Sequence, residues 1–139
     1  MQFRNEYYFL SNMYDKGCPL IISIGDITHT FTCVEAAFQA HKCPERADEF
    51  EGISGYEAKK LGRHVPLCKD WDLIKDDVML KCLRAKFTDK ILQEKLLAVH
   101  EPIVEDNTWG DTYWGRCNGV GKNRLGELLE QVKYEILLL

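Results

Sequence analysis

The sequence lacks the features that would mark a membrane protein or a chain of several domains. Its longest apolar run, residues 19–24, is far shorter than the roughly 20 residues that a membrane-spanning helix needs. Residues 1–9 contain Arg4 and Glu6 and hold no apolar segment typical of a secretory signal. No segment rich in proline, serine and glycine, and no internal repeat, interrupts the chain. These absences predict one domain over residues 1–139 and no membrane partner.

Positive charge and paired metal ligands are also scarce. Lys and Arg number 18 against 22 Asp and Glu, which gives a net charge of −4 and argues against nonspecific binding to a phosphate backbone. A small basic pocket remains compatible with this balance. None of the six cysteines forms a CxxC pair, and the four histidines show neither HxxxH nor HxH spacing. We therefore predict no metal site and no cofactor, and reduced cysteines in a cytoplasmic protein.

Apolar residues, at 45% of the chain, are sufficient for a folded core. Two β-branched segments, 20–24 and 27–32, flank Gly25 and Asp26, which predicts a hairpin. Capping boxes and apolar periodicity predict helices elsewhere. The predicted helices cover residues 33–43 after Thr32, 55–64 after Ser54, 74–87, 89–99, and a last helix with Asn123 as its N-cap. The expected fold class is mainly α, with one small β-hairpin near the N-terminus.

The predicted helix over 33–43 places Glu35, Gln39 and Lys42 on one stripe, because they stand at i, i+4 and i+7. If this stripe lines a pocket, Lys42 can act as a nucleophile toward a sugar carbonyl or as an anchor for an anion. A structural interpretation explains both charged residues as well. Glu35 fits the third position of a capping box, and Lys42 fits a last-turn cation that complements the helix dipole. Spacing alone leaves both interpretations open.

Residues 103–115 combine two tryptophans and a tyrosine with three carboxylates, without helical periodicity. A planar ligand stacks well on Trp109 or Trp114, and carboxylates such as Glu105 and Asp111 can stabilise an oxocarbenium-like centre or activate water. Alternatively, the two tryptophans only anchor the loop to the core. Next along the chain, the backbone N–H groups near Asn123 open the last helix and are a candidate phosphate site.

Arg63 ends the segment 57–63, one turn after Lys59 and Lys60. Its guanidinium is suited to a bidentate contact with an anionic ligand. An arginine near a helix end is also commonly a surface or C-capping cation. The sequence does not decide between these roles.

Eight segments, in order, resemble the NADAR family, also called YbiA-like. They are FLSNMY at 9–14, VEAAFQAHK at 34–42, EAKKLGR at 57–63, VM at 78–79, LRAKF at 83–87, EDNTWGD at 105–111, YWG at 113–115 and GKNRLGELL at 121–129. The resemblance implies a mainly α domain that cleaves N-glycosidic bonds without a metal. Two substrate branches are implied: phosphoribosylamino pyrimidines of riboflavin biosynthesis, and ADP-ribose attached to guanine in DNA.

Carried over position by position, the resemblance implies functional roles for Glu35, Lys42, Arg63, Glu105 and Asp111. Lys42, Glu35 and Asp111 are the expected catalytic residues. The expected substrate-binding residues are Asn12, Gln39, Arg63, Glu105, Trp109, Trp114, Gly115 and Asn123.

The leading hypothesis is an N-glycosidase that acts on a ribose C1–N bond. In it, Lys42 attacks or electrostatically traps C1 while Glu35 or Asp111 transfers protons. Arg63 and the N–H groups near Asn123 hold phosphate, and a tryptophan stacks on the base. The expected partner is a small ribosylated molecule, ADP-ribose-like or a phosphoribosylamino pyrimidine, or ADP-ribosylated nucleic acid. Two alternatives are a module that binds ADP-ribose or a nucleotide without turnover, and an interaction domain with no ribosyl ligand.

Overall fold

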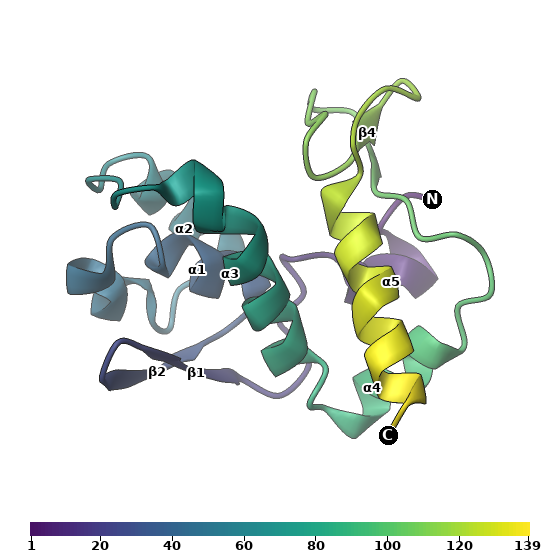
Figure 1. Cartoon of the computed structure of the whole chain (residues 1–139), viewed down its shortest axis with the longest axis horizontal. Helices are drawn as coiled ribbons and strands as arrows, with labels where there is room; N and C mark the ends of the chain where they lie inside the picture. The colour runs from purple at the N-terminus through teal and green to yellow at the C-terminus, as the bar shows by residue number, and fades with distance from the viewer. The chain divides into compact units, whose positions relative to one another are not determined.

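Helices dominate the computed structural model, which describes residues 1–139 (Figure 1). The elements are η1 Asn5–Leu10, β1 Leu20–Ile24, β2 Ile27–Phe31, α1 Val34–Ala40, η2 Pro44–Phe50, α2 Gly55–Gly62, α3 Trp71–Lys86, α4 Lys90–Leu97, β3 Asp106–Asn107, β4 Arg116–Cys117 and α5 Arg124–Leu137. The expected fold class, mainly α with an N-terminal hairpin, is confirmed. No helix has both the length and the apolar character needed to cross a membrane.

The chain packs into two compact units. One comprises Asn12–Lys86, and the other comprises Met1–Ser11 together with Phe87–Leu139. The single domain expected over residues 1–139 stays a prediction, and each unit is described by itself.

The hairpin of the Asn12–Lys86 unit forms as predicted. Strands β1 and β2 pair antiparallel, from Leu20 opposite Phe31 to Ile24 opposite Ile27. Gly25 opens the turn at φ 63°, a left-handed conformation that side-chain-bearing residues rarely adopt. Alternate residues of β1 are buried, so one face of the hairpin joins the core.

Helix α1 differs from its prediction at both ends. Its N-cap is Cys33, and no side chain caps it, because the Thr32 hydroxyl donates instead to the Ile53 carbonyl at 2.6 Å. The predicted capping box at Thr32 is therefore wrong. The helix ends at Ala40, so Lys42 lies just beyond it, in a turn where its N–H donates to the Gln39 carbonyl.

Helices α2 and α3 follow their sequence signals more closely. At α2, the Ser54 side chain accepts from the Glu57 N–H, and the Glu57 carboxylate accepts from the Ser54 N–H, both at 3.1 Å. This capping box is confirmed. Helix α3 begins at Trp71, three residues before the predicted start at 74, because Asp70 adopts φ 60° and its carbonyl accepts the first helical bonds.

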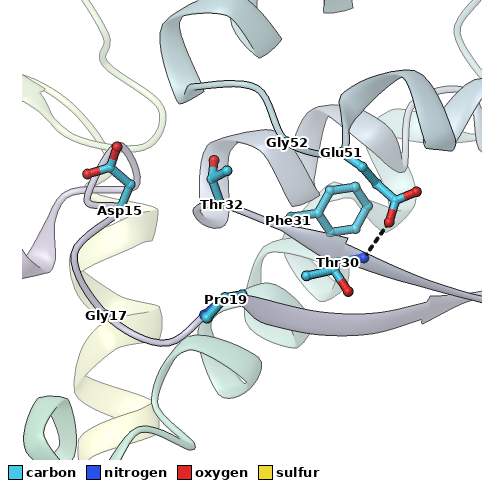
Figure 2. Close-up of a pocket in the computed structure, with 8 residues that line it drawn as sticks. All are labelled: Asp15, Gly17, Pro19, Thr30, Phe31, Thr32, Glu51 and Gly52. Carbon is cyan, nitrogen blue, oxygen red and sulfur yellow. Dashed lines mark hydrogen bonds between the residues drawn. The ribbon is translucent and has the colours of Figure 1, made fainter.

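An open groove of about 540 Å³ lies along the outer edge of β2 (Figure 2). It is lined by Asp15, Gly17, Pro19, Thr30, Phe31, Thr32, Glu51 and Gly52. Within it, the Thr30 N–H donates to Glu51 Oε1 at 2.7 Å. A carboxylate therefore accepts a hydrogen bond from a backbone N–H group on the edge of β2. None of the expected site residues lines this groove.

In the other unit, α4 and α5 pack through leucines that are almost completely buried. Asp89 caps α4, with its carboxylate accepting from the N–H groups of Ile91 and Leu92. The short strands β3 and β4 pair in parallel, and the sequence did not predict them. They flank the loop 108–115, which carries both candidate tryptophans.

Candidate active site

Helix α1 brings Glu35 and Gln39 into direct contact. Gln39 Nε2 donates to Glu35 Oε1 at 2.9 Å, and Gln39 is only 5% exposed. Helix α2 approaches so closely here that a Cβ on Gly62 would stand 2.0 Å from Gln39 Oε1. Gly62 thus allows the two helices to pack around the amide that holds the Glu35 carboxylate.

Asn12, which lies in the segment before the hairpin, also contacts Glu35. Its carbonyl accepts the Glu35 N–H at 2.9 Å, and its Nδ2 lies 3.6 Å from the Met79 sulfur. Asn12 Oδ1 and Gln39 Oε1 are buried and have no hydrogen-bond partner. Such atoms are rare in folded proteins and call for an explanation. Both belong to residues that contact Glu35, which favours a functional rather than a purely structural role for this region.

Lys42 lies in a corner formed by two aromatic rings. Its Nζ is 5.9 Å from the centroid of the Phe38 ring and 6.0 Å from that of Trp71, and the two rings stand 5.1 Å apart. Burial lowers the pKa of Lys42, Glu35 opposes this shift, and the nearby cations of Lys59 and Arg63 reinforce it. A lowered pKa enlarges the fraction of neutral, nucleophilic amine at neutral pH.

Sequence reasoning missed both Trp71 and Phe38 as neighbours of Lys42. Phe38 precedes Lys42 by four residues, so a helical spacing was available as a signal. Trp71 has no such signal, because it reaches Lys42 only through the packing of α3 against α1, and the predicted helix began after it. Trp71 is 7% exposed, so it forms a wall beside the lysine.

Arg63 fills one of its two expected roles, that of a C-capping residue, and its contact with an anion stays a prediction. It is the C-cap residue of α2, and its N–H donates to the Lys60 carbonyl. It is also close enough to Lys42 to lower the pKa of that amine, as Lys59 does. Three cations, Lys42, Lys59 and Arg63, therefore gather near the end of α1. This arrangement suits an anionic group such as phosphate.

In the other unit, Asp111 shapes the tryptophan loop. Its Oδ1 accepts the N–H groups of Tyr113 at 3.0 Å and Trp114 at 2.9 Å. Asn107, which sequence reasoning missed, clamps the same loop. Its Nδ2 donates to the Asp111 carbonyl and to Glu105 Oε1, and its Oδ1 accepts the Asp111 N–H. The fold thus brings Glu105 and Asp111 together through one asparagine.

Gly115 allows this loop to close. A Cβ there would stand 2.2 Å from Glu105 Oε1 and 2.8 Å from Asn107 Nδ2. The adjacent Trp114 contacts Tyr113 edge to face, with ring centroids 4.8 Å apart. Trp109, by contrast, is 62% exposed. The interpretation of Trp109 as an anchor to the core is therefore wrong, and its ring is open to a planar ligand.

The start of α5 is arranged differently from the sequence expectation. Asn123 is the N-cap residue, but its side chain makes no cap bond. It bridges the Ile103 carbonyl and the Glu105 N–H instead, each at 3.0 Å. The N–H groups of residues 122–125 all donate to carbonyls of residues 112–115. In this structure they are therefore bound to the loop and not open to a phosphate, which corrects that expectation.

The side chains of the chain form no group of three or more histidines, cysteines, aspartates or glutamates placed to hold a metal ion. The expected site residues thus form two groups. Asn12, Glu35, Gln39, Lys42 and Arg63 lie in one unit, and Glu105, Trp109, Asp111, Trp114, Gly115 and Asn123 lie in the other.

Comparison with known proteins places the chain in a family. The chain is 37% identical over 117 residues to N-glycosidase YbiA of Shigella flexneri, which covers 79% of this chain and 73% of the relative. It is 29% identical over 132 residues to the chloroplastic riboflavin biosynthesis protein PYRR of Zea mays, covering 78% of this chain and 20% of that protein.

A solved structure agrees with this similarity. The NMR structure of the Escherichia coli protein YbiA matches with a TM-score of 0.80 and 33% identity, covering 99% of this chain and 84% of that one. The family model described as NADAR domain matches residues 1–137. The chain therefore belongs to the NADAR family.

Proposed function

We propose that the protein is an N-glycosidase that hydrolyses the bond between C1 of a ribose and a nitrogen of its substrate. The observation that carries the proposal is the half-buried Lys42 in its aromatic corner, near Glu35 and the cations of Lys59 and Arg63. The relatives named N-glycosidase YbiA support the reaction class.

Lys42 supplies the nucleophile in this proposal. Its neutral amine attacks C1, and the C1–N bond breaks with both electrons passing to the leaving nitrogen, which takes a proton from Glu35 or Asp111. The amine then loses a proton, and the ring oxygen gains one as the sugar opens to a Schiff base. Water adds to C1, and its proton returns to the carboxylate. Release of the sugar regenerates the free amine.

The remaining residues bind the substrate. The phosphate lies against Arg63 and Lys59, where positive charge gathers. Trp109 or Trp114 stacks on the base, and Gln39 orients the Glu35 carboxylate. Two substrates meet these requirements: a phosphoribosylamino pyrimidine, in line with the relative named for riboflavin biosynthesis, and guanine-linked ADP-ribose in DNA. We place the reaction in the cytoplasm, because six free cysteines suit a reducing compartment.

Mass spectrometry of the two substrates tests the proposal. Each is incubated with wild-type protein, Lys42→Ala and Lys42→Arg, the last as a matched control that keeps the positive charge. We expect wild-type protein to release free base from one substrate and both variants to lose at least about 100-fold in turnover. Circular dichroism establishes that the variants are folded.

Two outcomes would contradict the proposal. Turnover by Lys42→Arg at the wild-type rate would reduce Lys42 to an electrostatic anchor. Intact substrates in every tube, with ADP-ribose bound tightly in a calorimetric titration, would instead indicate a binding module. Reduction with cyanoborohydride adds a direct readout, because a Schiff base leaves a sugar adduct on the Lys42 peptide.

A further inference from the structure

A second lysine in the Asn12–Lys86 unit takes no part in the mechanism above. Lys86 is the last residue of α3 and is only 3% exposed. It continues the buried face that Met79, Cys82 and Leu83 form on that helix. Lysine is among the residues that folded proteins bury least readily, since its ammonium loses hydration. A lysine at this position therefore calls for a role that an apolar residue would not fill.

The surroundings of Lys86 connect it to Glu35. Its Nζ lies 5.5 Å from the centroid of the Tyr14 ring, within the range of a cation–π contact. Tyr14 follows Asn12 by two residues, and the Asn12 carbonyl accepts the Glu35 N–H. Lys86 is also near Cys33, the N-cap residue of α1, two positions before Glu35. Lys86 thus lies near both segments that hold the Glu35 backbone.

We propose that Lys86 is a positioning residue for Glu35, which acts by holding the segment 12–14 against the first turn of α1. The inference rests on the proposed function, in which the Glu35 carboxylate transfers a proton. Lys86 does not contact the substrate. Its ammonium attracts the Tyr14 ring, and this contact fixes the Asn12 carbonyl on the Glu35 N–H.

The protonation state of Lys86 makes its contact with Tyr14 depend on pH. Burial lowers the pKa of Lys86 to about 7, so the ammonium that attracts the ring is present below pH 7 and lost above it. The titratable groups near it are Tyr14 and the thiol of Cys33, and Cys82 lies one turn before it on α3. Burial raises the pKa of Cys33 and raises that of Cys82 to about 12. Neither thiol therefore ionises near pH 7, where Lys86 titrates.

NMR spectroscopy of the Glu35 amide tests the inference without any substrate. In wild-type protein, the amide proton shift of Glu35 is expected to titrate with a midpoint near pH 7. In Lys86→Met this titration disappears, and protection of the Glu35 amide from hydrogen exchange falls about tenfold, while amides in the middle of α3 keep theirs. Lys75→Met, which removes a much less buried charge, 22% exposed and paired with Asp72, from the same helix, serves as the matched control and leaves both signals unchanged.

Turnover provides a second readout. We expect Lys86→Met to lower kcat about tenfold with little change in KM, because the carboxylate is displaced while the phosphate contacts remain. Lys86→Arg keeps a cation beside Tyr14 and restores most of the loss. If the protein proves not to be an N-glycosidase, the Glu35 amide still tests the positioning role.

Two results would overturn the inference. One is a wild-type Glu35 amide whose shift does not change around pH 7, a measurement that requires no variant to fold. The other is an equal loss of protection along α1 and α3 in both Lys86→Met and Lys86→Arg, which would show a lysine that merely fills the core.

Discussion

At the residue scale, the contact between Gln39 and Gly62 controls how Glu35 is held. The Gln39 side chain is buried between α1 and α2, and one of its atoms binds the Glu35 carboxylate. A glycine in a helix normally costs about 1 kcal/mol relative to alanine. Its presence at position 62 is explained by the Gln39 amide, which occupies the space that a Cβ would need.

This geometry predicts that Gly62→Ala destabilises the protein and lowers turnover, because the added methyl group displaces the Gln39 amide from Glu35. In a Gln39→Ala background the collision is absent. There, the same Gly62→Ala change is expected to raise the free energy of unfolding by about 0.5–1 kcal/mol through helix propensity. Urea denaturation of wild-type protein, Gly62→Ala, Gln39→Ala and the double variant measures the change in stability in both backgrounds.

The decisive result is that the effect of Gly62→Ala on the free energy of unfolding changes sign between the two backgrounds. If Gly62→Ala has the same effect in both backgrounds, Gln39 is not the group that excludes a side chain from position 62. Turnover of the Gln39→Ala single variant provides the reference for the loss of the amide alone.

At the element scale, the loop 108–115 is organised by side-chain oxygens rather than by strand pairing. Asp111 Oδ1 accepts two backbone N–H groups, so the same carboxylate that is a candidate acid or base also folds its own loop. A loss of activity in Asp111→Ala would therefore mix two causes.

Asp111→Asn separates them, because the amide oxygen still accepts both N–H groups while the side chain no longer carries a transferable proton. We expect Asp111→Asn to keep the wild-type amide shifts of Tyr113 and Trp114 and to lose about 100-fold in kcat. Asp111→Ala should lose the shifts as well. Full activity in Asp111→Asn would assign Asp111 a structural role and leave proton transfer to Glu35.

The elements also show what the sequence can and cannot predict. The hairpin turn at Gly25 and the capping box at Ser54 are local, and both were predicted correctly. The same box pattern at Thr32 failed, because the hydroxyl bonds to Ile53, a residue far away in the sequence. Among the site residues, Glu35 and Gln39 share a helical face that spacing reveals, whereas Trp71 and Asn107 act through tertiary contacts that spacing does not encode.

At the scale of the whole molecule, a buried histidine makes stability depend on pH. His41 is 7% exposed, its Nδ1 lies 2.6 Å from the Ala37 carbonyl, and its Nε2 lies 3.0 Å from Lys81 Nζ. This arrangement suits the neutral ring, with Nδ1 donating and Nε2 accepting. Burial lowers the pKa of His41 to about 4.

The unfolded chain binds a proton at His41 below about pH 6.5, and the folded chain does not bind it until about pH 4. Stability is therefore fully present above pH 6.5 and falls as the pH drops toward 4, by a total on the order of 3 kcal/mol. Urea denaturation between pH 7.5 and 4.5 measures this slope. His41→Gln should flatten it, whereas His100→Gln, at an exposed site, should not. Equal slopes in all three proteins would contradict the assignment.

The carboxylate beside β2 covers an open strand edge. A hairpin of two strands exposes backbone donors that another strand can use, and proteins protect such edges with charge. Glu51 both occupies the Thr30 N–H and places a negative charge there (Figure 2). We expect Glu51→Ala to self-associate as concentration rises, detectable by light scattering, whereas Glu49→Ala stays monodisperse. Self-association of Glu51→Ala would show that a single carboxylate ends the sheet at β2 and keeps it from adding a strand of a second molecule.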